Sequence, residues 1–237
     1  MVKFKKIKRL LVIPAKGKST RIKNKNIKIF LNKPIIYYIL DEARKSKLFS
    51  KIHVSTDSKK IANVVKKKIS IDFYRPKSLS GSKVPIYDVA RFVLEQYEKL
   101  NVIFDEIWIA LPCSPLIDFI DLKNISKELI KIQKPLITIS RFPCPIEWAL
   151  AMRGSKLIPI NKKKLLINSQ NFSHKYYDTG QVFASSLNQF KKIKEKNIIN
   201  HSHGYLMPPQ KSVDIDDMID WKTSETLYKG LKFRYIN

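Results

Sequence analysis

The chain has 237 residues, 44% of them hydrophobic, so it is long enough for one α/β domain with a sizeable core and is not compositionally disordered. Its formal net charge of +26 suggests an anionic partner, but only eight of its 46 basic residues are arginine and the lysines are dispersed. No apolar run reaches the ~18 residues of a membrane span, and two cysteines without metal-type spacing favour a reduced, cytoplasmic protein over a disulfide framework.

Strand and helix signals alternate along the first 140 residues. Apolar runs predict buried strands at residues 8–14, 51–56, 69–74, 106–111 and 135–140, with helices between them that begin near Pro34, Asp57 or Ser58, Ile86, and Asp118 or Asp121. Five such alternations predict a Rossmann-like, three-layer α/β fold whose parallel sheet carries helices on both faces. Ligands bind beyond the carboxyl ends of the strands in such sheets, so the site is expected there.

The alternation fails between residues 141 and 188, and we expect an insert there within a single domain spanning residues 1–237. A hairpin or a dimer arm is the candidate structure. The insert contains apolar side chains that a lone arm cannot bury: Phe142, Trp148, Leu150, Leu165, Leu166 and Phe172.

The loop after the first strand is suited to a triphosphate. Residues 14–21 read P-A-K-G-K-S-T-R, a small, polar, cationic segment at a strand end, where backbone N–H groups can approach phosphate oxygens. It matches neither G-x-x-x-x-G-K-[ST] nor G-x-G-x-x-G. Composition alone leaves a basic surface turn equally open.

The order of several motifs resembles the cytidylyltransferases that act on sialic acid and its relatives. P-A-K-G-K-S-T-R-I-K-N-K-N-I is similar to that family's P-A-R-G-G-S-K-R-I-P-R-K-N-I loop, and V-S-T-D, R-P-x-x-L-S, S-Q-N-F-S-H-K-Y-Y-D-T-G-Q-V-F and D-I-D before a Trp follow in order. The stretch F-P-C-P-I-E-W-A-L resembles the pseudaminic acid branch. The chain departs from the family at Lys16, Lys18, Thr20 and Asn168, and it lacks an Arg after P-C-S-P-L-I.

The resemblance implies a fold of the nucleotide-diphospho-sugar transferase type with a small dimerisation insert. It implies transfer of CMP from CTP to the anomeric hydroxyl of an acidic nine-carbon sugar, pseudaminic acid or a near relative, with Mg²⁺ as cofactor and release of pyrophosphate. It also implies a homodimer in which the insert of one subunit covers the active site of the other. Alternative acceptors are N-acetylneuraminic, legionaminic and eight-carbon keto-deoxy acids. A basic nucleic-acid-binding protein would need clustered Arg, Lys and aromatic residues, and neither nucleic acid nor a membrane is expected as a partner.

The resemblance also assigns site residues, each with a structural alternative. The catalytic candidates are Lys16, Arg21, Asp214 and Asp216. The CTP-binding candidates are Ala15, Lys16, Gly17, Ser19, Lys25, Asn26 and Arg75, for which solvated charge, a turn or a surface ion pair is the alternative. The sugar-binding candidates are Ser169, Gln170, Tyr177, Asp178 and Gln181. Asp214 and Asp216 share one face of an extended segment and either hold Mg²⁺ or cap the following helix.

Overall fold

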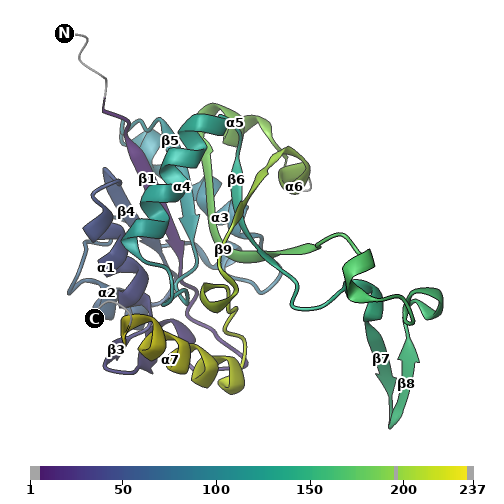
Figure 1. The fold of residues 1–237 in the computed structure, drawn as a ribbon. Helices are drawn as coiled ribbons and strands as arrows, with labels where there is room; N and C mark the ends of the chain where they lie inside the picture. The colour runs from purple at the N-terminus through teal and green to yellow at the C-terminus, as the bar shows by residue number, and fades with distance from the viewer. Residues whose placement is uncertain (1–5, 195–196, 234–237) are drawn as a thin grey trace.

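The computed structural model describes residues 6–194 and 197–233. Its centre is a six-stranded sheet in the order β10-β6-β9-β5-β1-β4 (Figure 1). The strands are β1 (Arg9–Pro14), β4 (Lys51–Ser55), β5 (Glu106–Ala110), β6 (Leu136–Arg141), β9 (Tyr176–Ser186) and β10 (His203–Leu206). β1 pairs in parallel with β4 and β5, and β10 pairs in parallel with β6, whereas β9 runs antiparallel to both β5 and β6.

Helices cover both faces of this sheet and make the expected three layers. They are α1 (Ile36–Ser46), α2 (Lys59–Val65), α3 (Ile86–Lys99), α4 (Phe119–Ile132), α5 (Leu187–Lys192) and α6 (Ile198–His201), while α7 (Met218–Phe233) packs apart from them, against Phe30 and Tyr38. Successive residues of β1 point to opposite faces: Leu11 packs with α1, α2 and α4, whereas Leu10 packs with α3, α5 and α6. None of the described helices has both the length and the apolarity required to span a bilayer.

Two predicted local elements are wrong. Residues 69–74 form no strand; Phe73 instead stacks its ring on His53 of the edge strand β4, with ring centroids 4.4 Å apart. Pro34 does not open the first helix; it belongs to the short strand β3 (Lys33–Pro34), paired with β2 (Ile29–Phe30), and α1 begins at Ile36. The predicted caps at Ser58 and Asp118 are confirmed by hydrogen bonds to backbone N–H groups of the following helices.

The boundary of the predicted insert also needs correction. Residues 176–186 are β9, which lies between β5 and β6 in the middle of the sheet. The chain leaves the sheet at the carboxyl end of β6 and returns at the same edge without a covering helix, so β9 must enter antiparallel. The projecting arm is therefore residues 142–175, which include β7 (Leu150–Arg153) and β8 (Lys156–Pro159) and extend away from the body (Figure 1).

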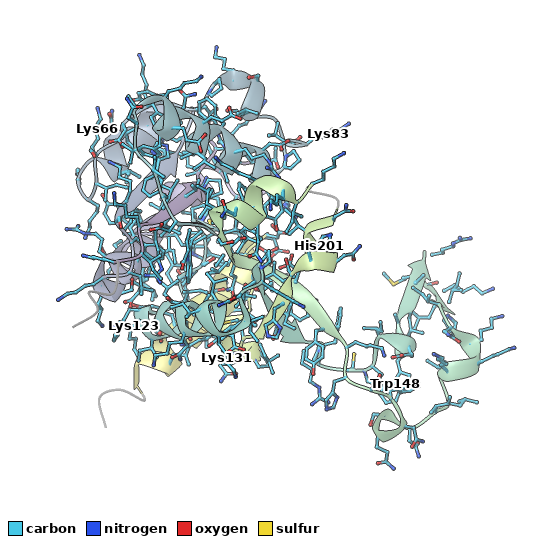
Figure 2. The ribbon with its side chains drawn as sticks, turned by 90° about the horizontal axis from the view of Figure 1, so that it is seen from above. Lys66, Lys83, Lys123, Lys131, Trp148 and His201 are labelled. Carbon is cyan, nitrogen blue, oxygen red and sulfur yellow. The ribbon has the colours of Figure 1, made fainter. Side chains whose placement is uncertain are left out.

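The charged side chains are dispersed over the surface. Figure 2 shows Lys66 and Lys83 on one side of the body, Lys123 and Lys131 of α4 on the opposite side, and Trp148 on the arm. This arrangement agrees with the interpretation of the lysines as a solvated surface.

Candidate active site

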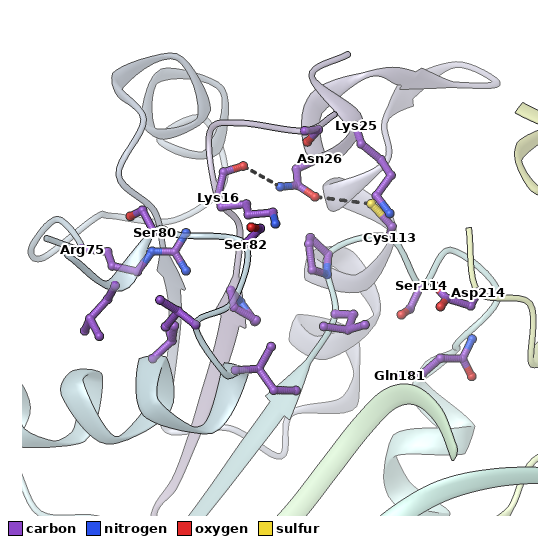
Figure 3. A pocket seen from close by; sticks show the side chains of 18 of the residues that line it. Lys16, Lys25, Asn26, Arg75, Ser80, Ser82, Cys113, Ser114, Gln181 and Asp214 are labelled. Carbon is purple, nitrogen blue, oxygen red and sulfur yellow. Dashed lines mark hydrogen bonds between the residues drawn. The ribbon is translucent and has the colours of Figure 1, made fainter. Parts of the chain in front are cut away.

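A cavity of about 260 Å³ lies beyond the carboxyl ends of β1 and β5. Seven of the residues predicted from the sequence line it: Lys16, Ser19, Lys25, Asn26, Arg75, Gln181 and Asp214. In Figure 3, Arg75, Ser80 and Ser82 lie on one side of this cavity, and Ser114, Asp214 and Gln181 lie on the opposite side. The site therefore has two ends, formed by segments that are far apart in the sequence.

The first loop is held against the end of β4. Ala15 is buried, and its N–H donates to Ser55 O at 2.9 Å. The Gly17 N–H donates to Asp57 Oδ1 at 2.8 Å. These bonds fix the backbone from which Lys16 and Ser19 reach the cavity. The predicted loop residues Ala15 and Gly17 thus support the lining residues rather than line the cavity themselves.

Asn26 is buried in a short helical turn of residues 25–27, and both ends of its amide are oriented by the protein. Its Nδ2 donates to Lys16 O at 3.0 Å, and the Cys113 thiol donates to its Oδ1 at 3.4 Å (Figure 3). Burial raises the pKa of Cys113 to about 12, so the thiol keeps its proton and remains a donor. The nitrogen and the oxygen of this amide can each make one more hydrogen bond, because Nδ2 carries two hydrogens and Oδ1 has two lone pairs.

Arg75 is buried in the cavity wall, and its backbone N–H donates to Thr56 O at 2.9 Å. Its guanidinium lies 3.6 Å from Asp57 Oδ1, while Nε and Nη2 make no hydrogen bond to any described residue. Burial lowers the pKa of Arg75, and the charge of Asp57 opposes that shift. Unsatisfied buried donors of this kind are suited to an acceptor on a ligand.

The paired carboxylates take different positions at the other end. Asp214 lines the cavity, and partial burial together with the neighbouring Asp216 raises its pKa. Asp216 lies outside the cavity lining, in a two-bond ion pair with Arg21. Neither caps α7, because Asp217 Oδ1 accepts from the N–H groups of Ile219 and Asp220. The capping alternative is therefore wrong for both predicted carboxylates.

Lys25 links the helical turn of residues 25–27 to the segment that contains Asp214 and Asp216. Its Nζ donates to Ile215 O at 2.6 Å and lies 3.7 Å from Asp216 Oδ1. The described residues contain no group of three or more His, Cys, Asp and Glu side chains suited to a metal. Two carboxylates beside the cationic loop predicted for phosphates nevertheless fit Mg²⁺, which commonly takes one or two protein carboxylates together with substrate phosphates and waters.

The predicted sugar-binding residues do not come together in this chain. Gln181 lines the cavity, and the hydroxyl of Tyr177 donates to Ser212 O at 3.4 Å nearby. Asp178 accepts from the Gly180 N–H at 2.8 Å, a bond local to β9. Ser169 and Gln170 lie elsewhere, in a separate hollow of about 250 Å³ at the base of the arm.

The orientation of Gln181 is set by a neighbouring loop. Its Nε2 donates to Lys211 O at 2.8 Å, which leaves the buried Oε1 without a hydrogen-bond partner among the described residues. The Lys211 ammonium in turn donates to Asp118 at 2.6 Å and Asp121 at 2.7 Å. Gln181, which lines the end of the cavity that holds Asp214, therefore has a buried acceptor, Oε1, that no described residue satisfies.

The sequence missed several lining residues. Ser80, Gly81 and Ser82 belong to the Gly- and Ser-containing loop after Arg75, whose composition was the available signal. Cys113 and Ser114 follow β5, the position at which parallel sheets place ligand contacts, yet nothing in their residue types indicated a role.

Comparison with known proteins gives consistent results. The sequence profile of the cytidylyltransferase family matches residues 10–138. The chain is 30% identical to the pseudaminic acid cytidylyltransferase of Campylobacter jejuni subsp. jejuni serotype O:23/36 (strain 81-176), over 94% of this chain and 97% of that protein. It is 27% identical to the CMP-N,N'-diacetyllegionaminic acid synthase of Legionella pneumophila subsp. pneumophila (strain Philadelphia 1), over 92% and 95% of the two chains.

The fold comparison agrees with these matches. The structure of CMP:2-keto-3-deoxy-manno-octonic acid synthetase complexed with CTP superposes with a TM-score of 0.67 at 13% identity, covering 94% of this chain and 99% of that one. This likeness concerns the fold alone, which is the α/β fold expected from the sequence. The family profile spans more than half of the chain, and the relatives match along almost its whole length. The chain therefore belongs to the cytidylyltransferase family.

Proposed function

We propose that this enzyme transfers CMP from CTP to the anomeric hydroxyl of a nine-carbon keto-deoxy sugar acid, pseudaminic acid or a near relative, and releases pyrophosphate. The observation that carries the proposal is the single cavity shared by Lys16, Lys25, Asn26, Arg75 and Asp214. It combines cations for a triphosphate, an amide for a base edge and a carboxylate for a cation. The 30% identity to a pseudaminic acid cytidylyltransferase supports the acceptor.

The residues around the cavity are assigned to different parts of the substrates. Lys16, Ser19, Arg21 and Lys25 neutralise and position the triphosphate, while Asn26 and Arg75 hold the nucleoside. Asp214 and Asp216 would hold Mg²⁺, which when bound would neutralise charge on the phosphates and on the leaving pyrophosphate. The sugar hydroxyl attacks the α-phosphorus and loses its proton to solvent, while the bond between the α-phosphorus and the pyrophosphate oxygen breaks. Gln181 Oε1 accepts a hydrogen bond from the sugar.

We further propose a homodimer in which the arm of one subunit covers the active site of the other. Leu150, Met152 and Leu157 lie on one face of the β7-β8 hairpin, because Met152 is paired with Leu157 and Leu150 with Pro159. Their exposed fractions are 46%, 72% and 59%, and a second subunit would bury them. The same contact would bring Ser169 and Gln170 to a partner's sugar site. The enzyme acts in the cytoplasm, in keeping with its two free cysteines.

Pyrophosphate release with CTP, Mg²⁺ and a panel of sugar acids tests the function. The panel contains pseudaminic, legionaminic, N-acetylneuraminic and eight-carbon keto-deoxy acids. Pseudaminic acid is expected to give the highest kcat/KM. A higher value for legionaminic acid would move the assignment to that acceptor, which the 27% identical relative favours. No release with any acid would refute the proposal.

A further inference from the structure

The end of β4 and the turn after it contact two segments that line the cavity. Ser55 O accepts from the N–H of Ala15 in the first loop, and Thr56 O accepts from the N–H of Arg75, each at 2.9 Å. The backbone of one short turn thus contacts both the loop predicted for phosphates and the residue predicted for the nucleoside. The side chain that follows, Asp57, extends this connection.

A single oxygen of Asp57 contacts both the first loop and Arg75. Its Oδ1 accepts from the Gly17 N–H at 2.8 Å and lies 3.6 Å from Arg75 Nη2. Arg75 is 6% exposed, so its cation depends on this carboxylate for compensation of its charge. Asp57 itself does not line the cavity.

Gly17 is required for this approach. A Cβ at position 17 would lie 2.7 Å from Ser58 Cβ, which is closer than packed carbons come. Any other residue would push the first loop away from the turn and lengthen its bond to Asp57. The close packing shows that the distance between loop and turn is set by the fold, not by a flexible contact.

We propose that Asp57 is a positioning residue that fixes the phosphate-binding loop and Arg75 relative to each other, and so sets the spacing between the two ends of the nucleotide site. This inference rests on the proposed function, because it assigns the first loop to phosphates and Arg75 to the nucleoside. Asp57 touches neither substrate nor metal in this scheme. It acts through the Gly17 N–H and the guanidinium.

The two contacts differ in kind, which allows them to be separated. The Gly17 contact is a hydrogen bond to an oxygen, and an asparagine Oδ1 can also accept it. The Arg75 contact depends on charge, which asparagine lacks. Asp57→Asn therefore removes the charge beside Arg75 and keeps the hydrogen bond to the Gly17 N–H, whereas Asp57→Ala removes both contacts.

Separate titrations of wild type and variants with CMP and with pyrophosphate, by calorimetry in Mg²⁺ buffer, test the proposal. Asp57→Asn is expected to weaken CMP binding roughly tenfold and to leave pyrophosphate binding unchanged. Asp57→Ala is expected to weaken both. Asp217→Asn, an isosteric change that keeps a good helix cap, serves as the matched control and is expected to bind both ligands normally.

A double-mutant cycle with Arg75→Lys keeps the proposal testable if Asp57→Ala does not fold. The losses of CMP affinity in Asp57→Asn and Arg75→Lys are expected to be non-additive, because both act through one guanidinium. Additive losses, equal weakening of both ligands by Asp57→Asn, or wild-type affinities in Asp57→Ala would each overturn the positioning role. Wild-type protein that binds neither CTP nor CMP would instead refute the proposed function.

Discussion

Arg21 and Asp216 are 195 positions apart in the sequence and form a two-bond ion pair, with Nη1–Oδ2 and Nη2–Oδ1 distances of 2.7 Å each. The pair joins the first loop to the segment that enters α7. Both members are assigned to the phosphate end of the proposed site, so each neutralises the other in the structure described. Binding of CTP with its cation is expected to exchange these partners.

The first prediction concerns the carboxylates beside that pair. Asp214→Asn and Asp216→Asn are each expected to reduce turnover at saturating CTP by at least a hundredfold, because an amide is a poor Mg²⁺ ligand. The rate is measured across a Mg²⁺ titration, with circular dichroism as the test of folding. Asp217→Asn is the control, since Asp217 only caps α7. Near-normal rates in both variants would contradict the metal assignment.

The second prediction concerns nucleotide choice. CTP is expected to be preferred over UTP, ATP and GTP, because the oriented amide of Asn26 can pair with the cytosine edge. Cys113→Ala, which removes the donor to Asn26 Oδ1, is expected to lower the CTP preference, and Cys113→Ser to restore it. The measurement is kcat/KM for the four nucleotides. Equal use of CTP and UTP by the wild type would argue against a cytosine reader here.

The third prediction concerns acid stability. Burial lowers the pKa of His53 from 6.5 to about 4; its Nδ1 lies 3.2 Å from the Tyr97 hydroxyl, which itself donates to Asp72. The unfolded chain takes up the His53 proton below pH 6.5 and the folded chain only near pH 4, so stability falls as pH falls between these values. The expected loss is about 3 kcal/mol in the free energy of unfolding.

Urea unfolding between pH 7 and pH 4 measures this slope. His53→Leu is expected to flatten it, whatever its effect on stability at pH 7. The exposed His174 supplies the control, and His174→Leu is expected to keep the wild-type slope. An unchanged slope in His53→Leu would show that other groups cause the acid sensitivity.

The fourth prediction concerns the ion cluster behind Gln181. Lys211 is 12% exposed and bonds both Asp118 and Asp121, so Lys211→Met leaves two neighbouring carboxylates without their cation. A loss of about 3 kcal/mol in unfolding free energy is expected. Lys33→Met removes a more exposed partner of Asp41 and is expected to cost under about 1 kcal/mol. Equal losses in the two variants would be inconsistent with a buried cluster.

The fifth prediction concerns assembly. Sedimentation at moderate ionic strength is expected to give a homodimer at micromolar concentration, and Met152→Lys is expected to shift it to monomer and to lower activity. Ile103→Lys is matched in exposure, 70% against 72%, but lies on the body beyond α3, and is expected to remain dimeric. A fully active wild-type monomer would rule out the shared site.

Much of the sheet and one wall of the site could be predicted from the sequence. The apolar runs of β1 and β5 and the cationic loop after β1 are local patterns, and a parallel strand places the next residues at the carboxyl edge. Lys16, Asn26 and Asp214 could be proposed because each belongs to a continuous motif. These strands and site residues can be identified from local periodicity and motif order alone, because neither depends on tertiary contacts.

Only the tertiary structure determined the features that are formed by segments far apart in the sequence. The direction of β9 follows from where the arm returns to the sheet, and residues 69–74 form no strand but place Phe73 against an edge strand. The Cys113–Asn26 bond and the position of Asp57 between Gly17 and Arg75 join residues from separate loops. No pattern along the chain specifies such pairs, because they arise only when the sheet brings its strand ends to one edge.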